Sequence, residues 1–106
     1  MDAKVWNEFA NRVDNGLRDG GVYADGVWWE DEYDEYNGNC CGRVLKIEIN
    51  RGDWKHDHLR AEWIVENDMG INVKEWENEV TDEDGSDCYS AIHTLRFWDE
   101  EDILVG

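Results

Sequence analysis

The sequence predicts an α+β fold in which an N-terminal helix packs on one face of a four- or five-stranded antiparallel sheet connected as a meander. Two patterns lead to this prediction. Residues 2–17 repeat apolar side chains every four positions, as one face of a helix does. Several later segments instead alternate apolar and polar side chains, as half-buried strands do. A chain of 106 residues supports one modest core, so we expect 1–106 to form a single domain.

The predicted helix covers residues 2–17. Its apolar stripe consists of Val5, Phe9, Val13 and Leu17, with Trp6 and Ala10 beside them. Asp2 suits the N-cap position, and either Gly16 or the Gly20-Gly21 pair can end the helix. Such a stripe is expected to lie across the sheet as part of the core.

The segment after the helix predicts one short strand near Val27–Asp31, followed by an exposed loop. Residues 25–36 contain six acids and no base. Aromatic side chains are interleaved with these acids: Trp28, Trp29, Tyr33 and Tyr36. Because aromatic rings supply contact area at little entropic cost, this mixture is more typical of an interface than of a solubilising tail.

A central antiparallel hairpin is predicted over Arg43–Glu66. The apolar members of its two alternating segments are Leu45, Ile47 and Ile49, then Leu59, Ala61, Trp63 and Val65. A register that places Lys46 opposite Glu62 makes the outer face a ladder of opposite charges. A slip of two residues would instead place Glu48 opposite Glu62, which is unfavourable.

A third strand is predicted from Ile71, paired with the second strand of the hairpin through Val65. Its phase changes where acids replace the apolar residues, at Glu75, Glu77 and Glu79. This change indicates either a β-bulge or a strand that runs past the helix into solvent. A short helix through Val73, Trp76 and Val80 is the alternative.

The last part of the chain predicts a fourth strand and a tethered end. Residues 88–98 alternate again, with Ala91, Leu95 and Phe97 on one face. The short apolar run 103–105 is expected to pin the chain end onto the core. Together with the earlier strands, this completes the predicted meander.

Charge dominates the composition. The 27 acidic and 10 basic residues give a net charge of −17, beyond the magnitude of about 2–8 that suffices to keep a small domain soluble. Seven Trp, four Tyr and two Phe argue for a folded rather than a disordered chain. The charge argues against direct binding of nucleic acid or of a membrane through a basic face, and it favours basic partners, cations or a saline medium.

Localisation is expected to be cytoplasmic. The N-terminus lacks the layout of a signal peptide, and no apolar run approaches the roughly 20 residues that span a bilayer. Three cysteines without a regular spacing fit a reducing compartment better than a disulfide framework. The sequence leaves the oligomeric state open.

No catalytic residue, cofactor or metal site is predicted, so we expect a protein that is not an enzyme. The chain lacks the nucleophile-elbow, P-loop, dinucleotide-binding and zinc-protease motifs. His56 and His58 fall in the predicted hairpin loop and His93 on another strand, so we expect solvated histidines rather than converging ligands. Cys40-Cys41 is too tight for paired metal ligands, and Asp82–Asp87 lacks the full ligand pattern of a calcium loop.

Two acidic stretches are the candidate partner-binding patches. The first consists of Glu30, Asp31, Glu32, Asp34 and Glu35, with Tyr33 and Tyr36 as apolar anchors. The second consists of Glu75, Glu77, Glu79, Asp82, Glu83 and Asp84. Alternate carboxylates on a strand lie about 6.6–6.8 Å apart, a spacing comparable with that of phosphates along a nucleic-acid backbone.

These features favour a non-enzymatic inhibitor that binds the basic nucleic-acid-binding surface of a nuclease or defence complex. In general character, a small, very acidic α+β protein resembles the inhibitors that phages use against restriction or CRISPR nucleases, and also nuclease immunity proteins. It could act as a nucleic-acid mimic or as a plug for a basic active site. The alternatives are an immunity protein of a nuclease toxin, or a structural or accessory protein whose acidity serves solubility or salt tolerance.

Overall fold

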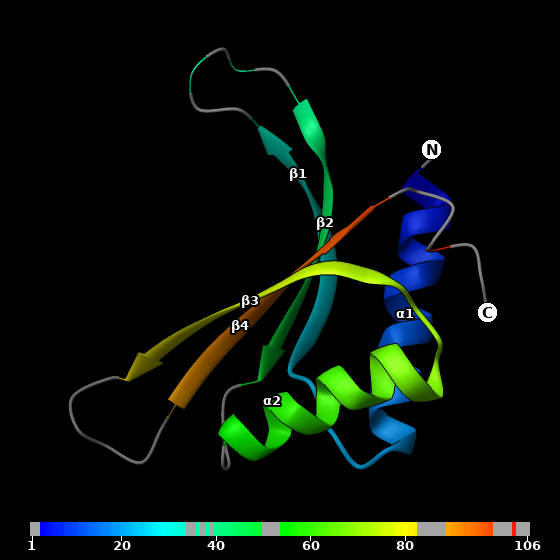
Figure 1. The fold of residues 1–106 in the computed structure, drawn as a ribbon, viewed down its shortest axis with the longest axis vertical. Helices are drawn as coiled ribbons and strands as arrows, with labels where there is room; N and C mark the ends of the chain where they lie inside the picture. Colours follow the sequence, from blue (N-terminus) through cyan, green and yellow to red (C-terminus); the bar gives the residue numbers. More distant parts are fainter. Residues whose placement is uncertain are drawn as a thin grey trace.

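The computed structural model describes residues 3–33, 36, 38, 40–49, 54–82, 89–98 and 103. Its elements, in chain order, are α1 (Ala3–Asp19), β1 (Gly26–Tyr33), β2 (Cys40–Ile49), α2 (Trp54–Trp63), the π-helical turn η1 (Ile64–Asp68), β3 (Val73–Asp82) and β4 (Tyr89–Phe97). The strands form one antiparallel sheet, and both helices lie to its right and below it in the view of Figure 1. The predicted fold class, an N-terminal helix on one face of an antiparallel sheet, is confirmed.

Helix α1 forms where its apolar stripe predicts it. The buried side chains of this helix are Trp6, Phe9, Ala10, Val13 and Leu17. The Gly20-Gly21 pair ends the helix, with Gly21 at a φ of 89°, which favours glycine. Val22 N–H donates to Leu17 C=O at 2.9 Å and Gly21 N–H donates to Arg18 C=O at 3.0 Å, the two bonds of a Schellman cap.

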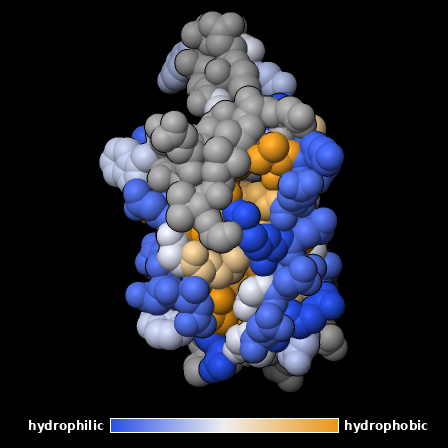
Figure 2. Space-filling model, turned by 90° about the vertical axis from the view of Figure 1, so that its right-hand side faces the viewer, coloured by the Kyte–Doolittle hydropathy of each residue, from blue (hydrophilic) through white to orange (hydrophobic). Residues whose placement is uncertain are grey.

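The covered face of the sheet carries the core. In the strand register, Leu45 lies opposite Trp29 and Leu95, and Leu95 lies opposite Trp76, so these side chains point to the same side. Phe9 of α1 packs on Phe97, with ring centroids 5.4 Å apart. Seen from the α1 side, the molecule is mostly hydrophilic, with a narrow strip of apolar side chains (Figure 2).

The predicted central hairpin is wrong in its second half. Residues 44–49 do form a strand, within β2, but 59–65 belong to α2 and η1. The predicted pair of Lys46 with Glu62 is therefore not formed. Instead, Lys46 Nζ donates to Thr94 Oγ1 at 2.8 Å, and Arg60 Nε donates to the Gly20 carbonyl at 2.6 Å.

The physical reason is that this segment fits two periods at once. Ala61 and Val65, which a strand would place inside, are also four residues apart on one helix face, and Ile64 lies beside them. All three are buried, whereas Leu59 is 65% and Trp63 is 56% exposed. The helical period thus excludes from the core two of the four residues that the alternation assigned to it.

The strand order is β1-β2-β4-β3 rather than that of a meander. With α2 in place of the second hairpin strand, β4 pairs with β2, and β3 pairs with β4 at the sheet edge. The predicted strand pairing of Val65 with Ile71 is therefore wrong, although Ile71 N–H does donate to the Val65 carbonyl at 3.0 Å. The strand over 73–82 is confirmed, and its change of phase is a bulge, because the register shifts between Val73 and Glu75.

The end of the chain is tied to α1. Ile103 is buried in the core, as predicted, and its carbonyl accepts a hydrogen bond from Arg12. Leu104, Val105 and the Asp2 cap lie outside the described residues. None of the described helices is long and apolar enough to cross a membrane.

Candidate functional site

The sheet face turned away from both helices is the candidate site, and we call it the open face. Its side chains, from one edge to the other, are Trp28, Glu30 and Glu32 of β1; Val44, Lys46 and Glu48 of β2; Ile92, Thr94 and Arg96 of β4; and Glu75, Glu77 and Glu79 of β3. Side chains alternate along each strand, so this set follows from the same register that directs Leu45 and Leu95 to the core. The described side chains of the open face therefore include six carboxylates and two bases.

Arg96 joins the two edges of the open face. Its Nε and Nη2 donate to the two carboxylate oxygens of Glu32 on β1 at 3.1 and 2.6 Å. On the other side, its Nη1 forms ion pairs with Glu77 at 3.1 Å and with Glu75 at 3.9 Å, both on β3. The bidentate bond from Arg96 lowers the pKa of Glu32, and the same bond raises the pKa of Arg96.

The remaining carboxylates of the open face are less engaged. Trp28 Nε1 donates to Glu30 at 2.9 Å, which leaves the negative charge of Glu30 in place. Among the described residues, neither Glu48 nor Glu79 forms a side-chain ion pair. Negative charge therefore remains at both edges after Arg96 is paired.

Of the thirteen predicted site residues, the structure brings five together on the open face: Glu30, Glu32, Glu75, Glu77 and Glu79. Part of each predicted patch thus lies on one surface. Tyr33 and Tyr36 are 60% and 99% exposed near the end of β1. Asp34, Glu35, Glu83 and Asp84 lie outside the described residues, as does the side chain of Asp82.

Asp31 does not belong to this surface. It lies on the covered side of β1, where its Oδ1 accepts from Arg43 Nε at 3.0 Å. The Arg43 guanidinium in turn lies 4.5 Å from the centre of the Trp29 ring, a cation–π contact. Asp31 therefore lies on the opposite face from Glu30 and Glu32, because neighbouring strand residues point to opposite faces.

Arg96 is the residue of the candidate site that the sequence did not single out. Its role depends on β4 pairing with both β2 and β3, and the mistaken hairpin assigned the place of β4 to 59–65. One signal was present in the sequence. Once β3 and β4 are treated as a hairpin, alternation places Arg96 on the same face as Glu75 and Glu77.

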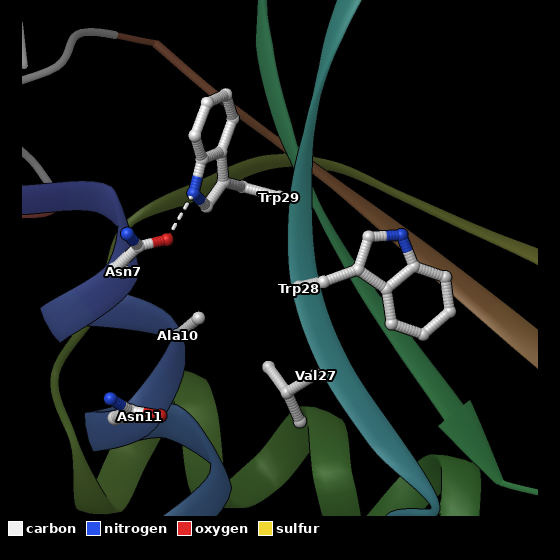
Figure 3. Close-up of a pocket in the computed structure, with 6 residues that line it drawn as sticks. All are labelled: Asn7, Ala10, Asn11, Val27, Trp28 and Trp29. Carbon is white, nitrogen blue, oxygen red and sulfur yellow. Dashed lines mark hydrogen bonds between the residues drawn. The ribbon is translucent and has the colours of Figure 1, made fainter. Parts of the chain in front are cut away.

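A hollow of about 340 Å³ lies between α1 and the edge strand β1 (Figure 3). It is lined by Asn7, Ala10, Asn11, Val27, Trp28 and Trp29. Val27 and Trp29 point toward α1, whereas Trp28 points the other way, toward the open face (Figure 3). The Trp29 indole is fixed, because its Nε1 donates to Asn7 Oδ1 at 2.7 Å.

A pair of histidines lies under α2 on the covered face, with His93 buried and His58 half-buried. His58 of α2 stacks on His93 of β4, with ring centroids 5.2 Å apart and planes at 9°. Asn78 of β3 joins them, because its Oδ1 lies 2.5 Å from His93 Nδ1 and its Nδ2 lies 3.0 Å from His58 Nε2. The prediction of a solvated loop histidine is wrong for His58, since α2 places its ring on that of His93; the side chain of His56 lies outside the described residues.

His93 is uncharged in the folded protein at neutral pH. Trp76 Nε1 donates to Asn78 Oδ1 at 2.9 Å, so this oxygen is an acceptor and His93 Nδ1 must carry a proton toward it. Burial, and to a smaller extent the neighbouring His58, lower the pKa of His93 to about 4. Parallel rings direct their nitrogen lone pairs along parallel planes, so the two rings do not converge on one metal ion.

Within the part of the chain that the structure describes, no three side chains of His, Cys, Asp or Glu gather as metal ligands. Comparisons with protein-family models, with curated proteins and with solved structures find no match to this chain. The chemistry of the open face is therefore the basis on which its function is proposed.

Proposed function

We propose that this protein is a non-enzymatic inhibitor that binds the basic nucleic-acid-binding surface of a nuclease or defence complex through its open face. One observation carries the proposal. Carboxylates from both edge strands, Glu30 and Glu32 of β1 and Glu75, Glu77 and Glu79 of β3, share one helix-free surface that holds only two bases among its described side chains. Such a surface attracts a cationic cleft and accelerates association with it.

Arg96 supports the proposal from inside the molecule. Its guanidinium is held by Glu32 on one side and by Glu77 on the other. The spacing of carboxylates on this face therefore suits a guanidinium group, which is the group that an arginine of a basic partner would present. Affinity would come from those pairs that become well hydrogen-bonded, and the other charges would mainly set the association rate.

Solubility alone would require acidic charge but no particular arrangement of it. The charges of the two helices indicate that the acids are not spread evenly over the molecule. Residues of α1 and α2 carry five acids and five bases, namely Glu8, Asp14, Asp19, Asp57 and Glu62 against Lys4, Arg12, Arg18, Lys55 and Arg60. The charge excess is therefore much larger on the open face than on the helices.

The test is inhibition of nucleases from several classes: restriction endonucleases, RNA-guided nucleases and nuclease domains of toxins. Cleavage is measured with increasing amounts of this protein and at increasing salt. We expect inhibition of at least one enzyme, weakening steeply as salt rises. The last class also tests the role of a toxin immunity protein.

Two variants with the same change in net charge separate location from total charge. E30K/E79K reverses two charges on the open face, and E8K/E66K reverses two exposed charges elsewhere, on α1 and η1. We expect E30K/E79K to abolish inhibition and E8K/E66K to retain most of it. Equal effects of the two variants, or no inhibited enzyme in any class, would contradict the proposal.

A further inference from the structure

Strand β1 is an edge strand of the sheet and borders the open face. It is the first strand in the order β1-β2-β4-β3, so among the described residues its only strand neighbour is β2. Every second residue of an edge strand directs its N–H and C=O groups outward, where another strand can pair with them. Such an edge is the usual place for an extended peptide to join a sheet.

The side chains of β1 differ on its two faces, and an added strand would meet both. On the open face lie Glu30 and Glu32, six to seven ångströms apart by strand geometry. On the covered side, the hollow between α1 and β1 presents the amides of Asn7 and Asn11 and the ring of Trp29 (Figure 3). Alternate residues of an incoming strand would therefore face carboxylates and a small polar hollow.

We propose that β1 receives an extended basic segment of the partner as a fifth strand, with Lys or Arg at every second position. The basic side chains lie over Glu30 and Glu32 on the open face, and the short residues between them face the hollow beside Asn7. This inference rests on the proposed function, because it names the part of the partner that the acidic face binds. It adds directional main-chain pairing to the charge attraction.

The charge of β1 favours a basic segment over a second copy of this chain as the added strand. Strand β1 carries Glu30, Asp31 and Glu32 and no base, so pairing with its own copy would bring acids together. The other edge strand is less suited. Strand β3 is bulged between Val73 and Glu75, and its Lys74 lies 5.1 Å from the Trp98 ring centre, which places positive charge on that edge.

The probe is the peptide Lys-Thr-Lys-Thr-Lys-Thr-Lys, which alternates a base with a short residue that favours strands. Two further peptides carry N-methyl groups on the lysines or on the threonines, which block hydrogen bonding along one peptide edge each without changing charge. Binding is measured by anisotropy of labelled peptide at low ionic strength. We expect one N-methylated peptide to bind about tenfold more weakly and the other to bind like the parent, because only one edge faces β1.

Amide hydrogen exchange locates the added strand. We expect the parent peptide to protect alternate amides of β1 and to leave those of β3 unchanged. Equal affinities of both N-methylated peptides, protection in β3, or no peptide binding would overturn the strand addition. If both N-methylated peptides bind as tightly as the parent peptide and E30K/E79K abolishes binding, the open face attracts bases by charge, without strand pairing. Strand pairing in a protein that inhibits no nuclease would contradict the proposed function instead.

Discussion

The two sides of the sheet differ in what holds their side chains together. On the covered side, rings and aliphatic groups of α1, α2 and the sheet are buried, and the charges carried by the helices balance. On the open face, the largest contact network is the set of ion pairs around Arg96, and acids exceed bases threefold. The covered side is therefore expected to determine stability, and the open face to determine which partner binds.

The largest effect on stability is expected from Phe9→Ala. The Phe9 ring is 1% exposed and contacts Trp6 and Phe97. Its removal leaves a cavity between helix and sheet and should lower the free energy of unfolding by about 3–5 kcal/mol. Urea unfolding followed by circular dichroism measures this change. A loss below about 1 kcal/mol would show that the covered side does not carry the stability.

We expect the stability of the covered side to depend on pH through His93. His93 titrates near pH 4 when folded and near its ordinary value of 6.5 when unfolded. The unfolded chain therefore binds more protons in this window, so stability falls as the pH drops from about 6.5 to about 4, by about 3 kcal/mol at most. Glu32 affects stability only at lower pH. Its pKa is depressed from the ordinary value of 4.5, so its stabilising contribution is complete above pH 4.5 and is lost as the pH falls further.

The variant His93→Gln isolates this effect from the other acids. Glutamine retains a donor toward Asn78 but has no proton to gain, so its unfolding free energy should decline less between pH 7 and pH 5. Urea unfolding of both proteins at the two pH values gives the comparison. Parallel declines would show that His93 is not buried as a neutral ring.

Arg96→Gln tests the network of the open face. Removing the guanidinium frees Glu32, Glu75 and Glu77, so we expect stability to fall by about 1 kcal/mol or less, because these side chains are partly exposed. Affinity for a basic partner should rise, since the face gains one unit of negative charge. Arg18→Gln is the matched control, because its ion pair with Asp14 spans 3.7 Å on the helix surface. A weakened affinity in Arg96→Gln alone would show instead that Arg96 positions the carboxylates for the partner.

The sequence predicted most elements of this fold because their patterns are unambiguous. The stripe through Phe9 and Val13 fits only a helix, and the alternation around Ile47 and Leu95 fits only a strand. The segment around Ala61 fitted both periods. A series with an apolar residue at every second position contains pairs four positions apart, such as Ala61 and Val65, and such pairs also share one face of a helix. In this segment, a plausible charge ladder favoured the wrong structure.

Part of the candidate site could be predicted because it depends only on alternation along a single strand. The parity of Glu75, Glu77 and Glu79 along one strand is local, so their shared face followed from alternation alone. Their meeting with Glu32 through Arg96 depends on a strand order that only non-local packing determines. The stack of His58 on the buried His93 depends on the docking of α2, which the mistaken hairpin had excluded.

The smallest expected effect on stability is that of Glu79→Gln, and it is the closest test of the contrast between the two sides. Glu79 is exposed on the open face and forms no side-chain ion pair with another described residue, so the unfolding free energy should change by less than about 0.5 kcal/mol. Binding of the inhibited nuclease should weaken by about two- to fivefold at low salt, as expected for one exposed charge pair. Glu8→Gln on α1 removes the same charge and should leave both quantities nearly unchanged. If the two variants weaken binding equally, the partner responds to total charge, and the clustering of carboxylates on the open face has no part in recognition.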